Sequence, residues 1–99
     1  MGISSNSKGF VVNIYETSFY CKCPINKIRI LYELKIETKE IISVEELLNH
    51  IEKWYADGFH ELIADHLAES FNGIQTLKAD HHSVKITTIR QGNERTDRT

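Results

Sequence analysis

Cys23 is the residue of this 99-residue chain with the clearest potential for covalent chemistry. A thiolate attacks electrophilic carbon, and nearby positive charge favours the thiolate over the thiol. Cationic residues lie close in sequence: Lys22, Lys27 and Arg29. The alternative interpretation is a small, half-buried residue at the end of a strand.

The adjacent pair His60 and Glu61 indicates a second kind of chemistry. A carboxylate accepts two hydrogen bonds from the neighbouring N–H and NH2 groups of a guanine-like ring edge. A histidine can bond such a ring or relay a proton near neutral pH. Both residues also have a structural explanation, because the first turn of a helix favours acidic residues and histidines occur at helix ends. Both explanations stay open for His60 and Glu61.

A metal site is not expected, although the sequence contains two paired sets of possible ligands. These sets are Cys21 with Cys23 and His81 with His82. Zinc sites usually take ligands two to four residues apart in each pair, and adjacent strand residues point to opposite faces. A disulfide between Cys21 and Cys23 would be strained, so we expect reduced thiols.

Four stretches have the composition of strands. Residues 10–20 are rich in β-branched and aromatic side chains and stop before Pro24. Residues 28–37 alternate closely, which predicts a strand with one buried and one wet face; the buried set is Ile28, Ile30, Tyr32, Leu34 and Ile36. Tyr15 and Leu31 suggest that the other sheet face is not wholly polar, so that it could close against neighbours in a barrel. Residues 74–79 and 84–89 are the two further strands.

Two helices are predicted between the second and third strands. Ser43 and Glu46 form a capping box, followed by an apolar stripe: Val44, Leu47, Leu48, Ile51 and Tyr55. Asp57-Gly58 ends this helix, and a second stripe follows until Asn72-Gly73: Phe59, Ile63, Leu67 and Phe71. The predicted fold class is therefore α+β, with a four-stranded antiparallel sheet in the order ββααββ and both helices on one face.

Composition limits the class of protein. We expect one domain over residues 10–90, a flexible leader at 1–9 and a flexible tail at 91–99. A net charge of −2 gives no reason for strong, sequence-independent nucleic-acid binding. No apolar run reaches the roughly 20 residues that cross a bilayer, and the N-terminus lacks the apolar core of a signal peptide. The expected location is cytoplasmic, with no membrane partner.

The element order and four short stretches resemble the tunnelling-fold superfamily. Its members include GTP cyclohydrolase I, 6-pyruvoyltetrahydropterin synthase, dihydroneopterin aldolase and the 7-cyano-7-deazaguanine nitrile reductases. Cys-Pro-Ile-Asn at 23–26 and Phe-His-Glu at 59–61 are similar to motifs of the nitrile reductases and of the archaeal amidinotransferases that make archaeosine in tRNA. The helix segment 63–67 is comparable in pattern, and residues 79–85 resemble a late strand of GTP cyclohydrolase I.

This resemblance implies a ββααββ tunnelling-fold unit that forms homo-oligomers with ligand sites between subunits. It assigns Cys23 as the nucleophile that forms a covalent thioimide with a nitrile, and Glu61 as the anchor of the ring, helped by His60 as a second catalytic residue. The chain also departs from the family. Ile30 stands where the nitrile enzymes have a proton-donating aspartate, and Asn26 and Ser83 stand where the cyclohydrolase has zinc ligands.

No cofactor is therefore expected. Residues 43–48 lack the lysines associated with NADPH in the reductases, so neither NADPH nor zinc is implied. The favoured function is an enzyme that acts on 7-deazaguanine, of the queuosine or archaeosine type. One alternative is a pterin or folate-pathway enzyme related to GTP cyclohydrolase or dihydroneopterin aldolase, and another is a non-catalytic oligomeric ligand-binding subunit. The partner is a purine- or pterin-like small molecule, with tRNA as a further candidate through Arg95 and Arg98.

Overall fold

Four strands and two helices follow one another in the order ββααββ in a computed structural model that describes residues 12–92. The elements are β2 (Asn13–Lys22), β3 (Arg29–Thr38), α1 (Val44–Trp54), α2 (His60–Ser70), β4 (Ile74–His81) and β5 (Val84–Gln91). The predicted leader at 1–9 lies outside the described residues. Of the predicted tail, Gln91 belongs to β5, and residues 93–99 also lie outside the described part.

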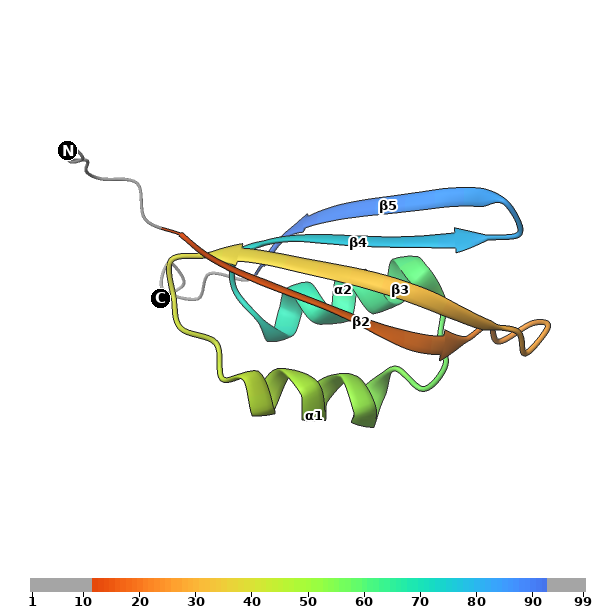
Figure 1. Cartoon of the computed structure of the whole chain (residues 1–99), viewed down its shortest axis with the longest axis horizontal. Coiled ribbons are helices and arrows are strands. Elements are labelled where there is room, and N and C mark those ends of the chain that lie inside the picture. The colour runs from red at the N-terminus through yellow and green to blue at the C-terminus, as the bar shows by residue number, and fades with distance from the viewer. Residues whose placement is uncertain (1–11, 93–99) are drawn as a thin grey trace.

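The four strands form one antiparallel sheet in the order β2-β3-β4-β5. Both helices lie on the same side of this sheet (Figure 1). The predicted α+β class, element order and sheet are confirmed. Within residues 12–92, neither helix is long and apolar enough to span a membrane.

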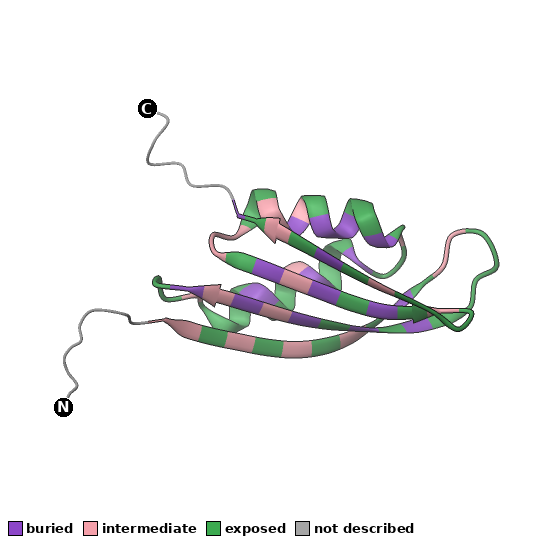
Figure 2. Ribbon diagram, turned by 90° about the horizontal axis from the view of Figure 1, so that it is seen from above, coloured by how far each residue is buried: buried purple, intermediate pink, exposed green. Residues whose placement is uncertain are grey.

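Alternate residues of the inner strands β3 and β4 are buried between the sheet and the helices, whereas those of the outer strands β2 and β5 are mostly half-buried (Figure 2). We call this side the helix-facing side and the other the open face. The predicted burial of Ile30, Tyr32, Leu34 and Ile36 is confirmed. Ile28 precedes β3 and is 49% exposed, because it lies in the β2–β3 loop.

Tyr15 does not lie on the open face, so this part of the prediction is wrong. Its partner across the β2–β3 pair is Ile36, which places it on the helix-facing side. There the Tyr15 hydroxyl accepts a hydrogen bond from the backbone N–H of Ile42, at 3.0 Å. Leu31 does lie on the open face and is 43% exposed.

The helices begin and end close to where sequence signals place them. The Ser43 hydroxyl accepts a hydrogen bond from the backbone N–H of Glu46 at 3.2 Å and begins α1. Leu47, Ile51 and Tyr55 from the predicted stripe are buried, whereas Val44 and Leu48 lie at its margins and are exposed. After α2, Gly73 takes a φ of 104°, and a Cβ there would lie 2.6 Å from the Glu37 carbonyl oxygen. Only glycine fits this turn into β4.

One tyrosine hydroxyl joins the two helices through two histidines. The Tyr55 hydroxyl lies 3.0 Å from Nε2 of His50 and 2.7 Å from Nδ1 of His66. The two imidazole rings stack with their centres 5.1 Å apart. The hydroxyl has one hydrogen, so it donates to one ring and accepts from an N–H of the other. This network packs α1 against α2 without requiring a charged histidine.

We predict that acid destabilises the fold through its partly buried histidines. The pKa of His50 is lowered, first by burial and then by the charges of His66 and Lys53, and burial lowers the pKa of His60. The folded state therefore binds fewer protons than the unfolded state, so the stabilisation is present above about pH 6.5 and is lost as the pH falls. Denaturant unfolding should give a smaller free energy at about pH 5.5 than at about pH 7.5.

His50→Gln is the matched variant for this prediction, since a glutamine amide can still bond the Tyr55 hydroxyl but does not titrate. It should reduce the difference between the two pH values. Equal unfolding free energies at both pH values in the unmodified chain would contradict the prediction.

Candidate functional site

The end of β2 is attached to the segment that leads into α2. The backbone N–H of Lys22 donates to the Ala56 carbonyl at 2.9 Å, and the N–H of Gly58 donates to the Lys22 carbonyl at 3.3 Å. Gly58 has a φ of 146°, a conformation that side chains rarely adopt, so glycine suits the turn from this attachment into α2. Cys23 and the pair His60–Glu61 consequently lie at the same end of the molecule.

Cys23 lies in a tight loop between β2 and β3. Its N–H donates to the Ile28 carbonyl, and its own carbonyl accepts from the N–H of Lys27, both at 2.9 Å. The side chain is half-buried and packs against the core, and both cysteines are free thiols. Cys21 is 1% exposed, and burial together with the charges of Asp57 and Cys23 raises its pKa to about 11. Cys23 is thus the better placed of the two thiols to react.

The cations predicted to support the Cys23 thiolate do not all face it. The Arg29 guanidinium lies 4.5 Å from the centre of the Tyr20 ring, and both side chains belong to the open face. Lys22 pairs with Arg29 across the two strands and shares that face. Lys27 is the remaining predicted cation, and it lies in the loop itself with a φ of 63°.

His60 is buried at the start of α2, with 2% of its surface exposed. Its Nε2 lies 3.1 Å from the Leu77 carbonyl oxygen and 3.2 Å from the Thr88 hydroxyl. A carbonyl only accepts hydrogen bonds, so Nε2 carries the hydrogen and Nδ1 is an acceptor. Nδ1 is buried and has no partner among residues 12–92. Burial also lowers the pKa of His60, which favours the neutral ring.

Tyr32 is the point at which the candidate residues converge. Its ring centre lies 5.2 Å from that of His60 and 5.7 Å from that of His81. Its hydroxyl lies 3.4 Å from Nε2 of His81. The pKa of Tyr32 is raised chiefly by burial and further by the negative charges of neighbours: Cys21, Cys23 and Glu61. Tyr32 therefore lies between the buried ring of His60 and that of His81.

Glu61 is exposed in the first turn of α2. Its carboxylate makes no hydrogen bond or ion pair with another side chain in the described part of the chain, so its acceptor positions are available. The partial positive charge at the N-terminus of α2 favours an acidic residue here, as the structural explanation requires. The same position leaves Glu61 free to accept hydrogen bonds from a ligand.

The sheet opens at the end that carries these residues. Pairing between β3 and β4 stops at Tyr32 and Ala79, whereas the two hairpins continue to their own tips, which diverge (Figure 1). Asn26 and His82 bridge the tips, with Nδ2 and Nε2 2.8 Å apart. No group of three or more metal-ligating side chains is found within residues 12–92.

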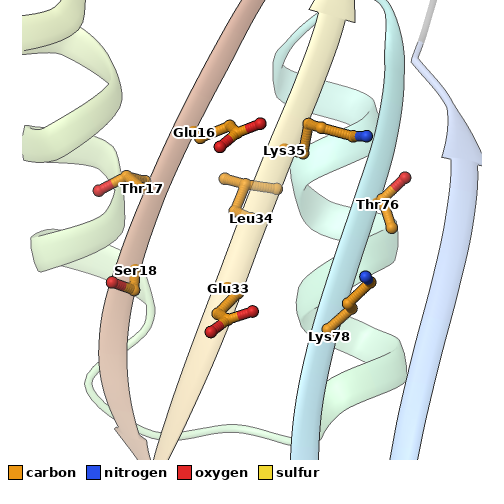
Figure 3. A pocket seen from close by; sticks show the side chains of 8 residues that line it. All are labelled: Glu16, Thr17, Ser18, Glu33, Leu34, Lys35, Thr76 and Lys78. Atoms are coloured by element: carbon orange, nitrogen blue, oxygen red, sulfur yellow. The ribbon is translucent and has the colours of Figure 1, made fainter.

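A hollow of about 460 Å³ lies on the open face, away from these residues (Figure 3). Opposite charges face each other across its strands, Glu16 with Lys35 and Glu33 with Lys78. Its floor is the exposed sheet, and it contains none of the predicted catalytic or binding side chains.

Sequence reasoning missed Tyr32 and His81 as members of this cluster. Tyr32 was assigned to the core by alternation alone, and His81 was considered only as a metal ligand. The one available signal was the position of His81 on the same side of the β4–β5 hairpin as the core residues Leu77 and Ala79.

Comparison with known protein families, with curated proteins and with solved structures finds no match to this chain. The geometry and chemistry of the chain's own residues therefore carry the functional argument.

We predict opposite behaviour of His60 and Glu61 on substitution. His60→Ala should lower the unfolding free energy by about 2–4 kcal/mol, because it leaves a cavity and removes the contacts of His60 Nε2 with the Leu77 carbonyl and the Thr88 hydroxyl. Glu61→Gln should lower it by less than about 1 kcal/mol, since only a helix-terminal charge is lost. Denaturant unfolding measures both. An equal loss in the two variants would contradict the burial difference described here.

Proposed function

We propose that this chain is a tunnelling-fold protein that binds a purine- or pterin-like ring and modifies a 7-deazaguanine nitrile through Cys23. The observation that carries the proposal is the attachment of Lys22 to Ala56 and Gly58, which places Cys23 and Glu61 at the same end of the molecule, where the Tyr32 hydroxyl also contacts His81. The ββααββ topology, with both helices between the second and third strands, is compatible with such a unit.

Glu61 supplies the recognition step in this proposal. Its free carboxylate accepts two hydrogen bonds from the N–H and NH2 groups on one edge of the ring, which fixes the orientation of the base. A ring held in this way directs its nitrile substituent towards the half-buried thiol of Cys23.

Cys23 supplies the covalent step. The thiolate attacks the nitrile carbon, a sulfur–carbon bond forms, and the carbon–nitrogen triple bond becomes a double bond whose nitrogen takes up one proton. The product is a thioimide that contains every atom of the nitrile. In the amidinotransferase-like reaction, ammonia then adds to this carbon and the Cys23 thiolate leaves, which gives an amidine without any reductant.

His81 is our proposed source of the proton. Ile30, at the position where the resemblance implies an aspartate, is buried beside Cys21 and cannot supply one. Tyr32 stays protonated because burial raises its pKa, and its hydroxyl contacts His81. His60 bonds Leu77 and Thr88 and packs against the ring of Tyr32. We therefore assign it to holding that ring in place rather than to proton transfer.

A pterin enzyme is the second candidate, favoured by the two histidines that flank Tyr32, since pterin chemistry also needs acid–base groups near an anchored ring. It keeps Glu61 but gives Cys23 no covalent role. A non-catalytic oligomeric ligand-binding or scaffold subunit is the third. A pterin that shifts the Glu61 amide signal without changing protein mass would favour the second, and no response to any ring would favour the third.

We predict a covalent adduct with 7-cyano-7-deazaguanine. Intact mass should increase by the full mass of the nitrile, because addition releases no leaving group. Trypsin cleaves after Lys22 and so separates the two cysteines into different peptides. The adduct should map to the peptide that begins at Cys23.

Cys23→Ala is the control that should abolish this adduct. Glu61→Gln should slow its formation by roughly tenfold, as expected for the loss of a charged hydrogen-bond acceptor. An adduct on Cys21, or one that persists in Cys23→Ala, would contradict the covalent role.

We also propose that the chain forms homo-oligomers. β2 and β5 are the two outer strands of the sheet, so each offers backbone groups on one side to a neighbouring subunit. Five large apolar side chains remain exposed on the open face: Ile14, Tyr20, Leu31, Ile74 and Ile89.

Light scattering coupled to gel filtration should give a multiple of the 11.5 kDa subunit mass. The multiple should persist on dilution if strand pairing and apolar burial hold the subunits together. A mass of one subunit at the highest concentration tested would exclude this assembly.

A further inference from the structure

Within residues 12–92, one side-chain hydrogen bond joins the β2–β3 loop to the β4–β5 turn. Asn26 in the β2–β3 loop and His82 in the β4–β5 turn are 56 residues apart in sequence, and Asn26 Nδ2 lies 2.8 Å from His82 Nε2. The backbone pairing between β3 and β4 has already stopped at Tyr32 and Ala79. The separation of the tips beyond that point depends on side-chain contacts.

The orientation of Asn26 is fixed from both ends of its amide. Its Oδ1 accepts a hydrogen bond from the backbone N–H of Ile28 at 3.0 Å. The amino group must therefore face His82, and the Nε2 atom of His82 must act as an acceptor. Turning the amide over would set its amino group against the Ile28 N–H, two donors facing each other.

Both tips hold residues in the left-handed backbone conformation without using glycine. His82 and Ser83 have φ values of 53° and 72°, and Lys27 has a φ of 63°. The two-residue turn His82-Ser83 is of a kind that usually contains Asn-Gly, because other side chains are strained there. A contact that holds both tips in place offsets this strain.

We propose that the Asn26–His82 bridge positions Cys23, an inference that rests on the role proposed for Cys23. Cys23 closes the loop that contains Asn26, through its hydrogen bonds to Ile28 and Lys27. A change at Asn26 is therefore transmitted to the Cys23 backbone. Asn26 and His82 contact no reacting atom in this scheme, so they are positioning residues that keep the thiol half-buried against the core.

The test is the rate of Cys23 alkylation by iodoacetamide, followed on the tryptic peptide 23–27. His82→Ala unties the tips without touching the Cys23 loop. It should raise the alkylation rate at Cys23 at least about threefold. The double variant Asn26→Ala with His82→Ala should alkylate less than about twofold faster than the faster of the two single variants, because the two residues act as one unit. Where the nitrile adds to Cys23, the same variants should slow adduct formation.

His82→Gln is the matched rescue variant. The glutamine carbonyl can accept from Asn26 Nδ2, whereas alanine cannot, and both carry the same left-handed strain. Glutamine should return the rate to within about twofold of the unmodified chain. Ser83→Ala, in the same turn, should leave the rate unchanged.

Cys21 distinguishes positioning from general loosening of the fold. Its thiol is buried, so its alkylation should stay slow in every variant if only the Cys23 loop responds. An unchanged Cys23 rate in His82→Ala, effects that multiply in the double variant, or parallel increases at both cysteines would overturn the proposal. Iodoacetamide needs no ring recognition, so a failed nitrile adduct with intact coupling would refute only the proposed function.

Discussion

The attachment of Lys22 to the segment before α2 is the constraint on which the arrangement of the candidate site depends. Two backbone hydrogen bonds, to Ala56 and from Gly58, hold the end of β2 beside the start of α2. Cys23 follows directly on one side of this attachment, and His60 and Glu61 follow on the other. Because the bonds are made by backbone groups, most side chains are compatible with them. The exception is Gly58, whose positive φ takes the chain away from β2 and into the helix.

Burial on the helix-facing side then decides which groups can react. Cys21 and Cys23 are the same residue type two positions apart, yet Cys21 lies within the strand beneath the helices and Cys23 lies where the strand has ended. Desolvation disfavours the charged form of the first thiol. The same effect keeps Tyr32 protonated and favours neutral His60. Burial thus keeps Cys21, Tyr32 and His60 neutral, whereas Cys23 is half-buried and Glu61 is exposed.

Local sequence patterns predicted much of the fold, because they depend on local geometry. The alternation in 28–37 identified the buried side chains of β3, and Ser43 identified the start of α1. Tyr15 was misplaced because its face is set by the pairing of β2 with β3, and a shift of one residue exchanges the two faces.

The contacts that assemble the site were not predictable in the same way. The proximity of Lys22 to Gly58 and of Asn26 to His82 joins segments far apart in the chain, and no local pattern encodes either contact. His60 was considered as a group that reaches a ligand, but the first turn of α2 packs towards β4 and β5, so its ring bonds Leu77 and Thr88. The sequence indicated which side chains could do chemistry, and tertiary packing determined which of these side chains are exposed and which, like His60, are buried.

Ile30, Asn26 and Ser83, which differ from the motifs of the tunnelling-fold resemblance, each have a physical setting in this structure. A carboxylate at Ile30 would be buried beside Cys21, where it would need a partner to offset its desolvation. Asn26 and Ser83 do not offer the ligands that the resemblance places at those positions, and an amide–imidazole bond joins the two tips instead. In the proposed reaction one hairpin supplies the nucleophile, the other supplies the acid and α2 supplies the ring anchor. Cys23 and His81 lie in the parts of the two hairpins beyond the last backbone pair between β3 and β4, Tyr32 with Ala79.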